Sequence, residues 1–233
     1  MFRVKFADHT IAVDNKYPFV ERLCKDYLAD EKPEFTVKVT DDEIQAENKD
    51  GGHWSADYLE SLAVYRRICE RLLDDDVILF HCSALAINGK AVLFTAPSGT
   101  GKSTHTRLWR EHFGDQVVMV NDDKPLLHIG DTITVYGTSY GGKDNLQTNT
   151  SAEVKAVVIL HQAPENTITE MNTKQAFPTL LNQTYRKETA DGMIKTLGLV
   201  DKLSHLPVFS LGCNISDDAI MTVYNELKGR NLL

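Results

Sequence analysis

Residues 96–103, APSGTGKS, have the residue types and spacing of a loop that binds phosphate groups. The usual pattern is Gly-x-x-x-x-Gly-Lys-Ser/Thr, and Ala96 replaces its first glycine. In such a loop, backbone N–H groups at the start of a helix point towards an anion and act together with the helix dipole. The apolar run AVLFTA precedes the loop and a helical pattern over 102–113 follows it, which is the context that a phosphate loop requires.

The same loop predicts how a nucleoside triphosphate and its metal would be bound. Lys102 would reach the β- and γ-phosphates, and the Ser103 hydroxyl would ligate Mg²⁺. The nucleotide is expected to be ATP because NDDK, residues 121–124, is not the Asn-Lys-x-Asp motif that recognises guanine. The other nucleotide-binding residues that the loop predicts are Ser98, Gly99, Thr100, Gly101 and Thr104.

Two adjacent carboxylates, Asp122 and Asp123, follow the short apolar run Val117–Val120. A carboxylate at the end of a buried strand can bind the water shell of a magnesium ion or accept the proton of an attacking hydroxyl. Adjacent strand residues point to opposite faces, so the two acids are expected to differ in role. We assign Asp122 as the base and Asp123 to the metal, with the reverse assignment open. A polar turn between two strands is the structural alternative.

Three further side chains are candidates for contact with the transferred phosphate. His81 could orient the aspartate base or contact the γ-phosphate, the alternative being a hydrogen-bonded histidine of the core or of a sheet edge. Lys143 follows the glycine-rich stretch 137–142, which would let the backbone approach a ligand, and its charge could offset that of the phosphoryl group. Arg186 ends an amphipathic helix and could also reach a phosphate. A flexible solvent loop and a solvated arginine are the alternatives for these two.

Together these motifs resemble the catalytic domain of HPr kinase/phosphorylase over about residues 80–160. The shared features are a hairpin strand that begins at a histidine, the loop SGTGKST, one short helix and a strand that ends in Asp-Asp. The chain resembles, more distantly, the nucleotide-binding domain of phosphoenolpyruvate carboxykinase, in which SGTGK and an Asp-Asp pair also occur. The resemblance implies an active-site histidine at His81, the loop lysine and serine at Lys102 and Ser103, and the paired acids at Asp122 and Asp123.

The chain departs from that family downstream of the acids. HPr kinase/phosphorylases have an Arg-Gly-rich segment that handles inorganic phosphate, and YGGKDNLQTNTS, residues 140–151, stands in its place here. This departure puts in doubt both a phosphorylase activity and HPr as the acceptor. The longer arrangement looks like a divergent branch of HPr-kinase-like proteins, some of which are associated with peptide modification.

The expected fold class is α/β, with a mixed sheet and a phosphate-loop core of the type that the resemblance implies. Residues 1–54 are predicted to form a small α+β annex and residues 55–233 the kinase-like domain. In the annex we expect a hairpin of FRVKFA and TIAV, a helix within 17–29, and strands at FTVKV and EIQAE. In the domain we expect strands within 77–87, 91–96, 117–120, 156–161 and 207–211, a hairpin around Gly130-Asp131, and helices within 55–76 and over 102–113, 174–186, 189–202 and 216–228.

Composition and charge predict a soluble cytoplasmic protein. The net charge of −8 argues against nucleic acid as a partner, because binding to the phosphate backbone depends on Lys and Arg. The four cysteines are far apart and form no Cys-x-x-Cys pair, which indicates reduced thiols and neither a zinc site nor a disulfide framework. There is no apolar signal region and no run of apolar residues long enough to span a membrane, so no membrane partner is expected.

The sequence therefore predicts a Mg²⁺- and ATP-dependent kinase. Its acceptor would be a hydroxyl-bearing substrate, either a protein or peptide serine or a small metabolite. A nucleotide-binding regulatory module with little turnover is the alternative, although the short spacing between loop and acids leaves no room for a mobile switch segment. A decarboxylating carboxykinase would need a larger chain. The resemblance to a hexameric kinase also suggests a homo-oligomer.

Overall fold

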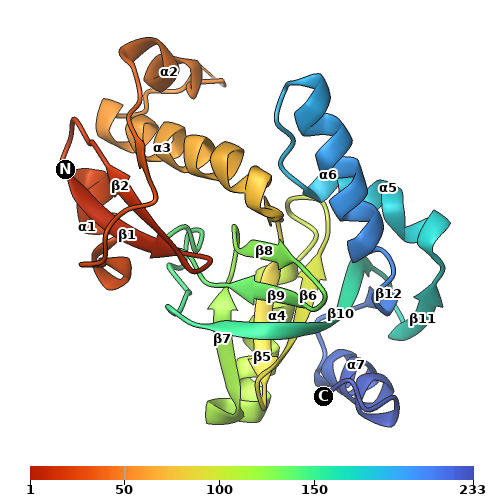
Figure 1. Ribbon diagram of the computed structural model, residues 1–233. Coiled ribbons are helices and arrows are strands. Elements are labelled where there is room, and N and C mark those ends of the chain that lie inside the picture. The colour runs from red at the N-terminus through yellow and green to blue at the C-terminus, as the bar shows by residue number, and fades with distance from the viewer. Residues whose placement is uncertain (50) are drawn as a thin grey trace. The chain divides into compact units, whose positions relative to one another are not determined.

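The computed structural model describes residues 1–49 and 51–233 and divides into two compact units, Met1–Val77 and Ile78–Leu233 (Figure 1). We predicted a boundary after residue 54. The division in the structure falls later because helix α3, Ala56–Leu72, packs against the helices Phe19–Leu23 and Asp41–Ala46 of the first unit. Leu59, Ile68 and Leu72 are buried at helical spacing along α3.

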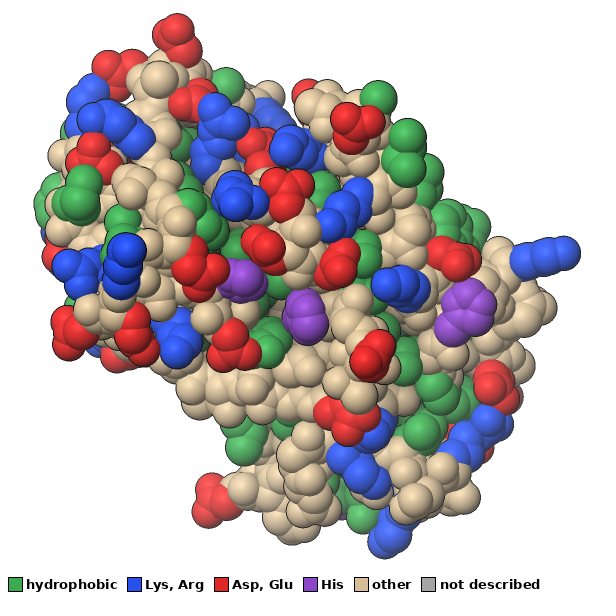
Figure 2. Space-filling view, viewed as in Figure 1, with side chains coloured by type: hydrophobic (Ala, Val, Ile, Leu, Met, Phe, Trp, Pro, Cys, Tyr) green, Lys and Arg blue, Asp and Glu red, His purple; other side chains and the backbone are tan. Residues whose placement is uncertain are grey.

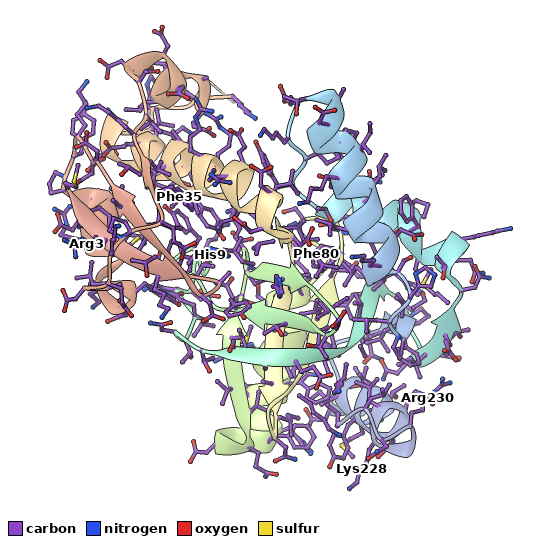
Figure 3. The ribbon with its side chains drawn as sticks, in the orientation of Figure 1. Arg3, His9, Phe35, Phe80, Lys228 and Arg230 are labelled. Carbon is purple, nitrogen blue, oxygen red and sulfur yellow. The ribbon has the colours of Figure 1, made fainter. Side chains whose placement is uncertain are left out.

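The first unit contains a small sheet with the strand order β1–β2–β3. β1, Phe2–Phe6, and β2, His9–Val13, form the predicted antiparallel hairpin, and β3, Phe35–Val37, pairs parallel with β2. Side-chain contacts join the strands to neighbouring segments. His9 Nδ1 lies 2.8 Å from Glu34 Oε2, and the Arg71 guanidinium lies 5.3 Å from the ring centroid of Phe35 (Figure 3 labels His9 and Phe35).

The prediction of a strand at EIQAE is wrong, because most of these residues lie in α2, Asp41–Ala46. The Thr40 side chain accepts a hydrogen bond from the backbone N–H of Glu43, and the Glu43 side chain accepts one from the backbone N–H of Thr40. This capping box marks a helix start, and the acidic side chains in the first turn interact favourably with the helix dipole. These end signals outweigh the weak alternation of the segment. In addition, the predicted helix within 17–29 is the short α1, Phe19–Leu23, followed by a 3₁₀ turn at Lys25–Tyr27.

The second unit is built on a mixed sheet with the strand order β4–β8–β9–β10–β6–β5–β7, and β12 pairs with β10 and β11. The predicted strand region 77–87 is divided into two strands by residues 80–82. The strand bounds are β4 Val77–Leu79, β5 Ser83–Ile87, β6 Lys90–Thr95, β7 Val117–Asn121, β8 Leu126–Ile129, β9 Ile133–Tyr136, β10 Ser151–Gln162, β11 Thr167–Met171 and β12 Val208–Cys213.

Strands β6, β10 and β12 run parallel, and Phe94 and Phe209 both lie opposite Val158 of β10. Their carboxyl ends therefore lie at one edge of the sheet, where the loop 96–101 follows β6. In open α/β sheets, ligands bind outside the carboxyl ends of parallel strands. This edge is thus the place at which a ligand site is expected.

Helices α4, Lys102–Phe113, and α7, Asp217–Gly229, pack together beside this sheet. An apolar cluster between sheet and helices contains the fully buried Trp109, Phe94 and Val223. The C-terminal end of α7 is joined to β11, because Arg230 forms ion pairs of 2.6 Å with both Glu226 and Glu170 (Figure 3 labels Arg230). The remaining helices of the unit are α5 Thr173–Gln183 and α6 Ala190–Leu203.

The bounds of α4 confirm the prediction of a helix over 102–113. Strand β11, in contrast, is not predicted from the sequence. It pairs only with β12 among the described strands, and Thr167, Thr169 and Glu170 are exposed. A polar edge strand lacks the alternation of apolar residues that reveals a half-buried strand.

The described surface carries charges of both signs. Figure 2 shows acidic and basic side chains interspersed over the face in view. Among the described residues, no helix combines the length and the apolar character that crossing a membrane requires.

Candidate active site

The loop between β6 and α4 has the backbone conformation that its glycines allow. Gly99 has φ +80° and Gly101 has φ +118°, both in a region that residues with a Cβ rarely adopt. Gly101 is the N-cap of α4, and no described side chain caps this helix end. The first N–H groups of α4 therefore remain available to an external acceptor.

Lys102, the first residue of α4, is 8% exposed and lies over this loop. Its Nζ donates a hydrogen bond of 2.9 Å to the carbonyl oxygen of Ala96. Burial lowers the pKa of Lys102, and the charges of Asp123, Cys82 and Asp122 oppose that shift. The ammonium group is thus positioned by the loop itself, next to the two carboxylates.

Asp122 lies beside Thr106 of α4 and is 6% exposed. The Thr106 hydroxyl oxygen lies 3.4 Å from Asp122 Oδ1 and 3.3 Å from the carbonyl oxygen of Ser103. The Asp122 carbonyl oxygen accepts a hydrogen bond of 3.3 Å from the Ser83 hydroxyl. Asp122 and Ser103 therefore lie near each other, with Thr106 in contact with both.

Asp123 makes different contacts. Its Oδ1 lies 3.2 Å from His81 Nε2, and its Oδ2 lies 2.6 Å from Lys124 Nζ. Burial alone would raise the pKa of Asp123, but the hydrogen bond from His81 and the adjacent Lys124 ammonium outweigh burial and lower the pKa to about 2. The carboxylate is thus ionised throughout the physiological range.

This lowered pKa predicts an acid-sensitive contribution of Asp123 to stability. The folded-state pKa of about 2 lies below the unperturbed 3.8, so the contribution is complete above pH 3.8 and is lost as the pH falls through about 2. We expect the difference in unfolding free energy between wild type and Asp123→Asn to narrow by about 2 kcal/mol over this interval. Urea denaturation at a series of pH values measures it; a difference independent of pH would contradict the expectation.

Hydrogen bonds to Gln183 of α5 and Thr95 of β6 position His81. Its backbone N–H donates to the carbonyl oxygen of Gln183 at 2.7 Å, and its Nδ1 lies 2.8 Å from Gln183 Oε1. Its own carbonyl oxygen accepts from the Thr95 hydroxyl at 2.9 Å. The preceding Phe80, labelled in Figure 3, is fully buried. These contacts direct the remaining ring nitrogen, Nε2, towards Asp123.

Asn121 organises the turn that carries both acids, a role that we did not predict. Its Oδ1 accepts hydrogen bonds from the backbone N–H groups of Asp123 at 2.9 Å and Lys124 at 2.8 Å. Its Nδ2 donates to the Thr138 carbonyl oxygen at 3.0 Å. The side chain is fully buried. Its hydrogen bonds connect the turn that carries the two acids to the glycine-rich stretch 137–142, which we call the connector. An Asn directly after a buried strand is a known turn former, which is the signal that could have identified it.

Asn121→Ala is expected to lower the unfolding free energy by about 2–3 kcal/mol, because it removes a fully buried, hydrogen-bonded side chain and leaves two partly buried backbone N–H groups without their acceptor. Chemical denaturation measures this change. Thr222→Ala, on the exposed side of α7, is the control and should change stability by less than about 0.5 kcal/mol. A change at Asn121 as small as the control would show that the turn does not depend on this side chain.

The loop, the acids and the connector enclose a cleft of about 460 Å³. At the connector, Gly142 approaches closely, since a Cβ at this position would lie 3.1 Å from the Cβ of Asp123. The structure therefore brings together most of the residues predicted for the site. The cleft is lined by His81, Ser98, Gly99, Gly101, Lys102, Ser103, Thr104, Asp122, Asp123, Gly142, Lys143 and Asp144.

Two predicted residues lie elsewhere. Thr100 lines a second cavity, on the other side of the loop. Arg186 lines neither space; its Nη1 donates to the carbonyl oxygen of Leu181, in the helix that precedes it, at 3.1 Å. Gln183 was not predicted as a site residue, and it contributes to the site by its hydrogen bond to His81. The two residues are 102 positions apart in the sequence, so no local pattern reveals this contact.

Comparison with known proteins gives a family match for the central part of the chain. Residues 48–198 match the model of the family described as "SynChlorMet cassette protein ScmC". The Hpr(Ser) kinase/phosphatase from Coxiella burnetii is similar in structure with a TM-score of 0.37 and 13% sequence identity, over 66% of this chain and 94% of that chain. Comparison with curated proteins gives no match.

Proposed function

The chain belongs to the ScmC family of SynChlorMet cassette proteins, and we propose that its second unit is the catalytic domain of an ATP-dependent kinase. The substrate would be a hydroxyl group of a peptide, a protein or a small metabolite. The phosphate-binding loop and the sheet would then form a core of the HPr kinase type. The observation that carries this proposal is a single cleft that contains the loop, Lys102, Ser103 and two carboxylates, one of them paired with a histidine.

Phosphoryl transfer requires little covalent chemistry from the protein, because positioning and charge stabilisation supply most of the catalysis. The loop N–H groups and Lys102 are suited to bind the phosphates of ATP. Lys102 would exchange its hydrogen bond to Ala96 for one to the substrate, and Lys143 at the rim of the cleft would add a positive charge.

The contacts of the two acids support the reverse of our first assignment. Asp122 lies at the turn of α4 that carries Ser103, which suits it to the metal. Asp123 is held by His81, which suits it to accept the hydrogen bond of the attacking hydroxyl and then its proton. We therefore propose Asp123 as the base, His81 as its positioning residue and Asp122 as the metal-binding acid.

The donor set fits Mg²⁺. The cleft offers carboxylate and hydroxyl oxygens, and among the described residues no group of three or more His, Cys, Asp or Glu side chains could form a complete metal cage. Mg²⁺ is usually bound by one or two carboxylates together with waters and substrate phosphates. When bound, it would neutralise charge on the transferred phosphate. Ser103 and Asp122 are the residues proposed to hold it.

The test is a label-transfer experiment with γ-labelled ATP, Mg²⁺ and a clarified cell extract heated to inactivate its own kinases. We expect label to enter a new compound with the wild-type protein and not with Lys102→Met. Label in the acid-precipitable fraction would identify a protein or peptide acceptor, and label in the acid-soluble fraction a small molecule. If ATP binds but no label is transferred in a Lys102-dependent way, the regulatory nucleotide-binding module replaces the kinase.

A further inference from the structure

A second cavity, of about 650 Å³, lies on the other side of the same loop. Gly99, Gly101 and Thr104 line both this cavity and the cleft of the carboxylates. A ligand bound across the loop backbone could therefore extend into both spaces. The other residues that line the second cavity are Thr100, His105, Leu108, Gln162, Ala163, Pro164, Cys213, Asn214 and Ile215.

The two spaces differ in chemistry. The cleft is lined by three acidic side chains and two lysines, whereas the second cavity is lined by neither acids, lysines nor arginines. Burial lowers the pKa of His105 to about 4, so this histidine is neutral at physiological pH. Apolar side chains such as Leu108, Pro164 and Ile215 supply much of the remaining lining. Such a surface suits an uncharged, flat, partly apolar group.

The sheet explains why this cavity lies where it does. Gln162 ends β10 and Cys213 ends β12, and these two residues are register partners. The segments that follow, Ala163-Pro164 and Asn214-Ile215, therefore leave the sheet at the same edge as the loop that follows β6. Asn214 Nδ2 donates to the Pro164 carbonyl oxygen at 3.0 Å, which joins the two segments.

Two polar side chains, His105 and Gln162, line this cavity. The indole Nε1–H of Trp109 can only donate, and it lies 3.0 Å from His105 Nε2, so Nε2 is the acceptor and Nδ1 carries the proton. His105 is 3% exposed, and its Nδ1 has no hydrogen-bond partner among the described residues. Gln162 Nε2 donates to the Thr100 carbonyl oxygen at 3.3 Å, which leaves Gln162 Oε1 as an acceptor beside the cavity.

We infer that the second cavity binds the nucleoside part of the phosphate donor, with its purine base against Leu108, Pro164 and Ile215. This inference rests on the proposed function, because the triphosphate would cross the loop into the cleft. It adds a specific claim: affinity for ATP depends on side chains that have no part in binding phosphate.

The test compares MgATP with magnesium tripolyphosphate, which has the phosphates but no nucleoside, by isothermal titration calorimetry. We expect wild type to bind MgATP at least about tenfold more tightly than the tripolyphosphate. Ala163→Phe would fill the cavity and remove most of this difference while leaving the tripolyphosphate affinity within about twofold. Ile215→Ala, at a side chain that is 80% exposed, should weaken MgATP binding severalfold with little effect on folding. Its matched control is Ile194→Ala on α6, 67% exposed and outside both cavities.

The outcomes separate this inference from the proposed function. If wild type binds both ligands equally, or if Ala163→Phe and Ile215→Ala leave the preference for MgATP unchanged, the nucleoside does not occupy this cavity, although the loop still binds phosphates. An equal loss of both ligands in both variants would also overturn the inference, since it would indicate a disturbed loop. If wild type binds neither ligand, the proposed function itself fails.

Discussion

Lys102→Met should reduce the rate of phosphoryl transfer by about 10²–10³-fold or more. Methionine retains the length and apolar stem of lysine but removes the only lysine ammonium group that is buried at the loop among the described residues. The variant should slow phosphoryl transfer more than it weakens ATP binding, because the loop N–H groups can still bind the phosphates. Single-turnover transfer from γ-labelled ATP to the acceptor identified in the extract measures the effect.

A matched control for this variant is Lys174→Met, an exposed lysine of α5 outside the cleft. It should transfer phosphate at the wild-type rate. Circular dichroism and a thermal melt establish whether Lys102→Met is folded, since its replacement leaves two carboxylates without a nearby buried cation. Wild-type transfer by a folded Lys102→Met protein would exclude the assignment of the loop as the phosphate site.

Asp123→Asn should lower kcat by about 10²–10⁴-fold and leave the affinity for MgATP within about twofold of wild type. Asparagine keeps the shape of the side chain and one acceptor oxygen, but it cannot accept the hydroxyl proton. Asp122→Asn should behave differently: because Asp122 is proposed to bind the metal, its main effect would be a higher Mg²⁺ concentration for half-maximal activity. Steady-state kinetics over a range of Mg²⁺ concentrations separates the two.

The contact with His81 allows a sharper test of the same assignment. If His81 acts through Asp123, then His81→Gln should reduce kcat in the wild-type background and have little further effect in Asp123→Asn. The control for Asp123→Asn is Asp131→Asn, which removes one carboxylate charge from an exposed turn. If Asp122→Asn, and not Asp123→Asn, removes turnover at saturating Mg²⁺, the original assignment of Asp122 as the base is restored.

Local parts of this site could be predicted from the sequence because local patterns encode them. The glycines at 99 and 101, the lysine that begins the helix and the apolar strand before the loop are contiguous, so their geometry follows from neighbouring residues. The Asp-Asp pair was located for the same reason, as the end of an apolar run. The helix at 102–113 has both a strong amphipathic pattern and a glycine at each end.

The relations across the sheet could not be predicted from such patterns. The different environments of Asp122 and Asp123 depend on α4 for one residue and on His81 for the other, and the position of His81 depends on Gln183 at the end of α5. No local period in the sequence encodes these tertiary contacts. The polar strand β11 was not predicted. The segment of α2 was predicted to be a strand from a weak alternation, which the capping box at its start outweighs.

The hydrogen bond between Trp109 and His105 gives the protein an intrinsic optical reporter. Only two tryptophans occur in the chain, and Trp54 is 51% exposed whereas Trp109 is fully buried. Indole emission responds to the polarity around the ring and to the partner of its N–H group. Because that partner is a ring that lines the second cavity, occupancy of the cavity would alter the emission of Trp109. In a Trp54→Phe background, ligand entry could then be followed in real time in the unlabelled protein.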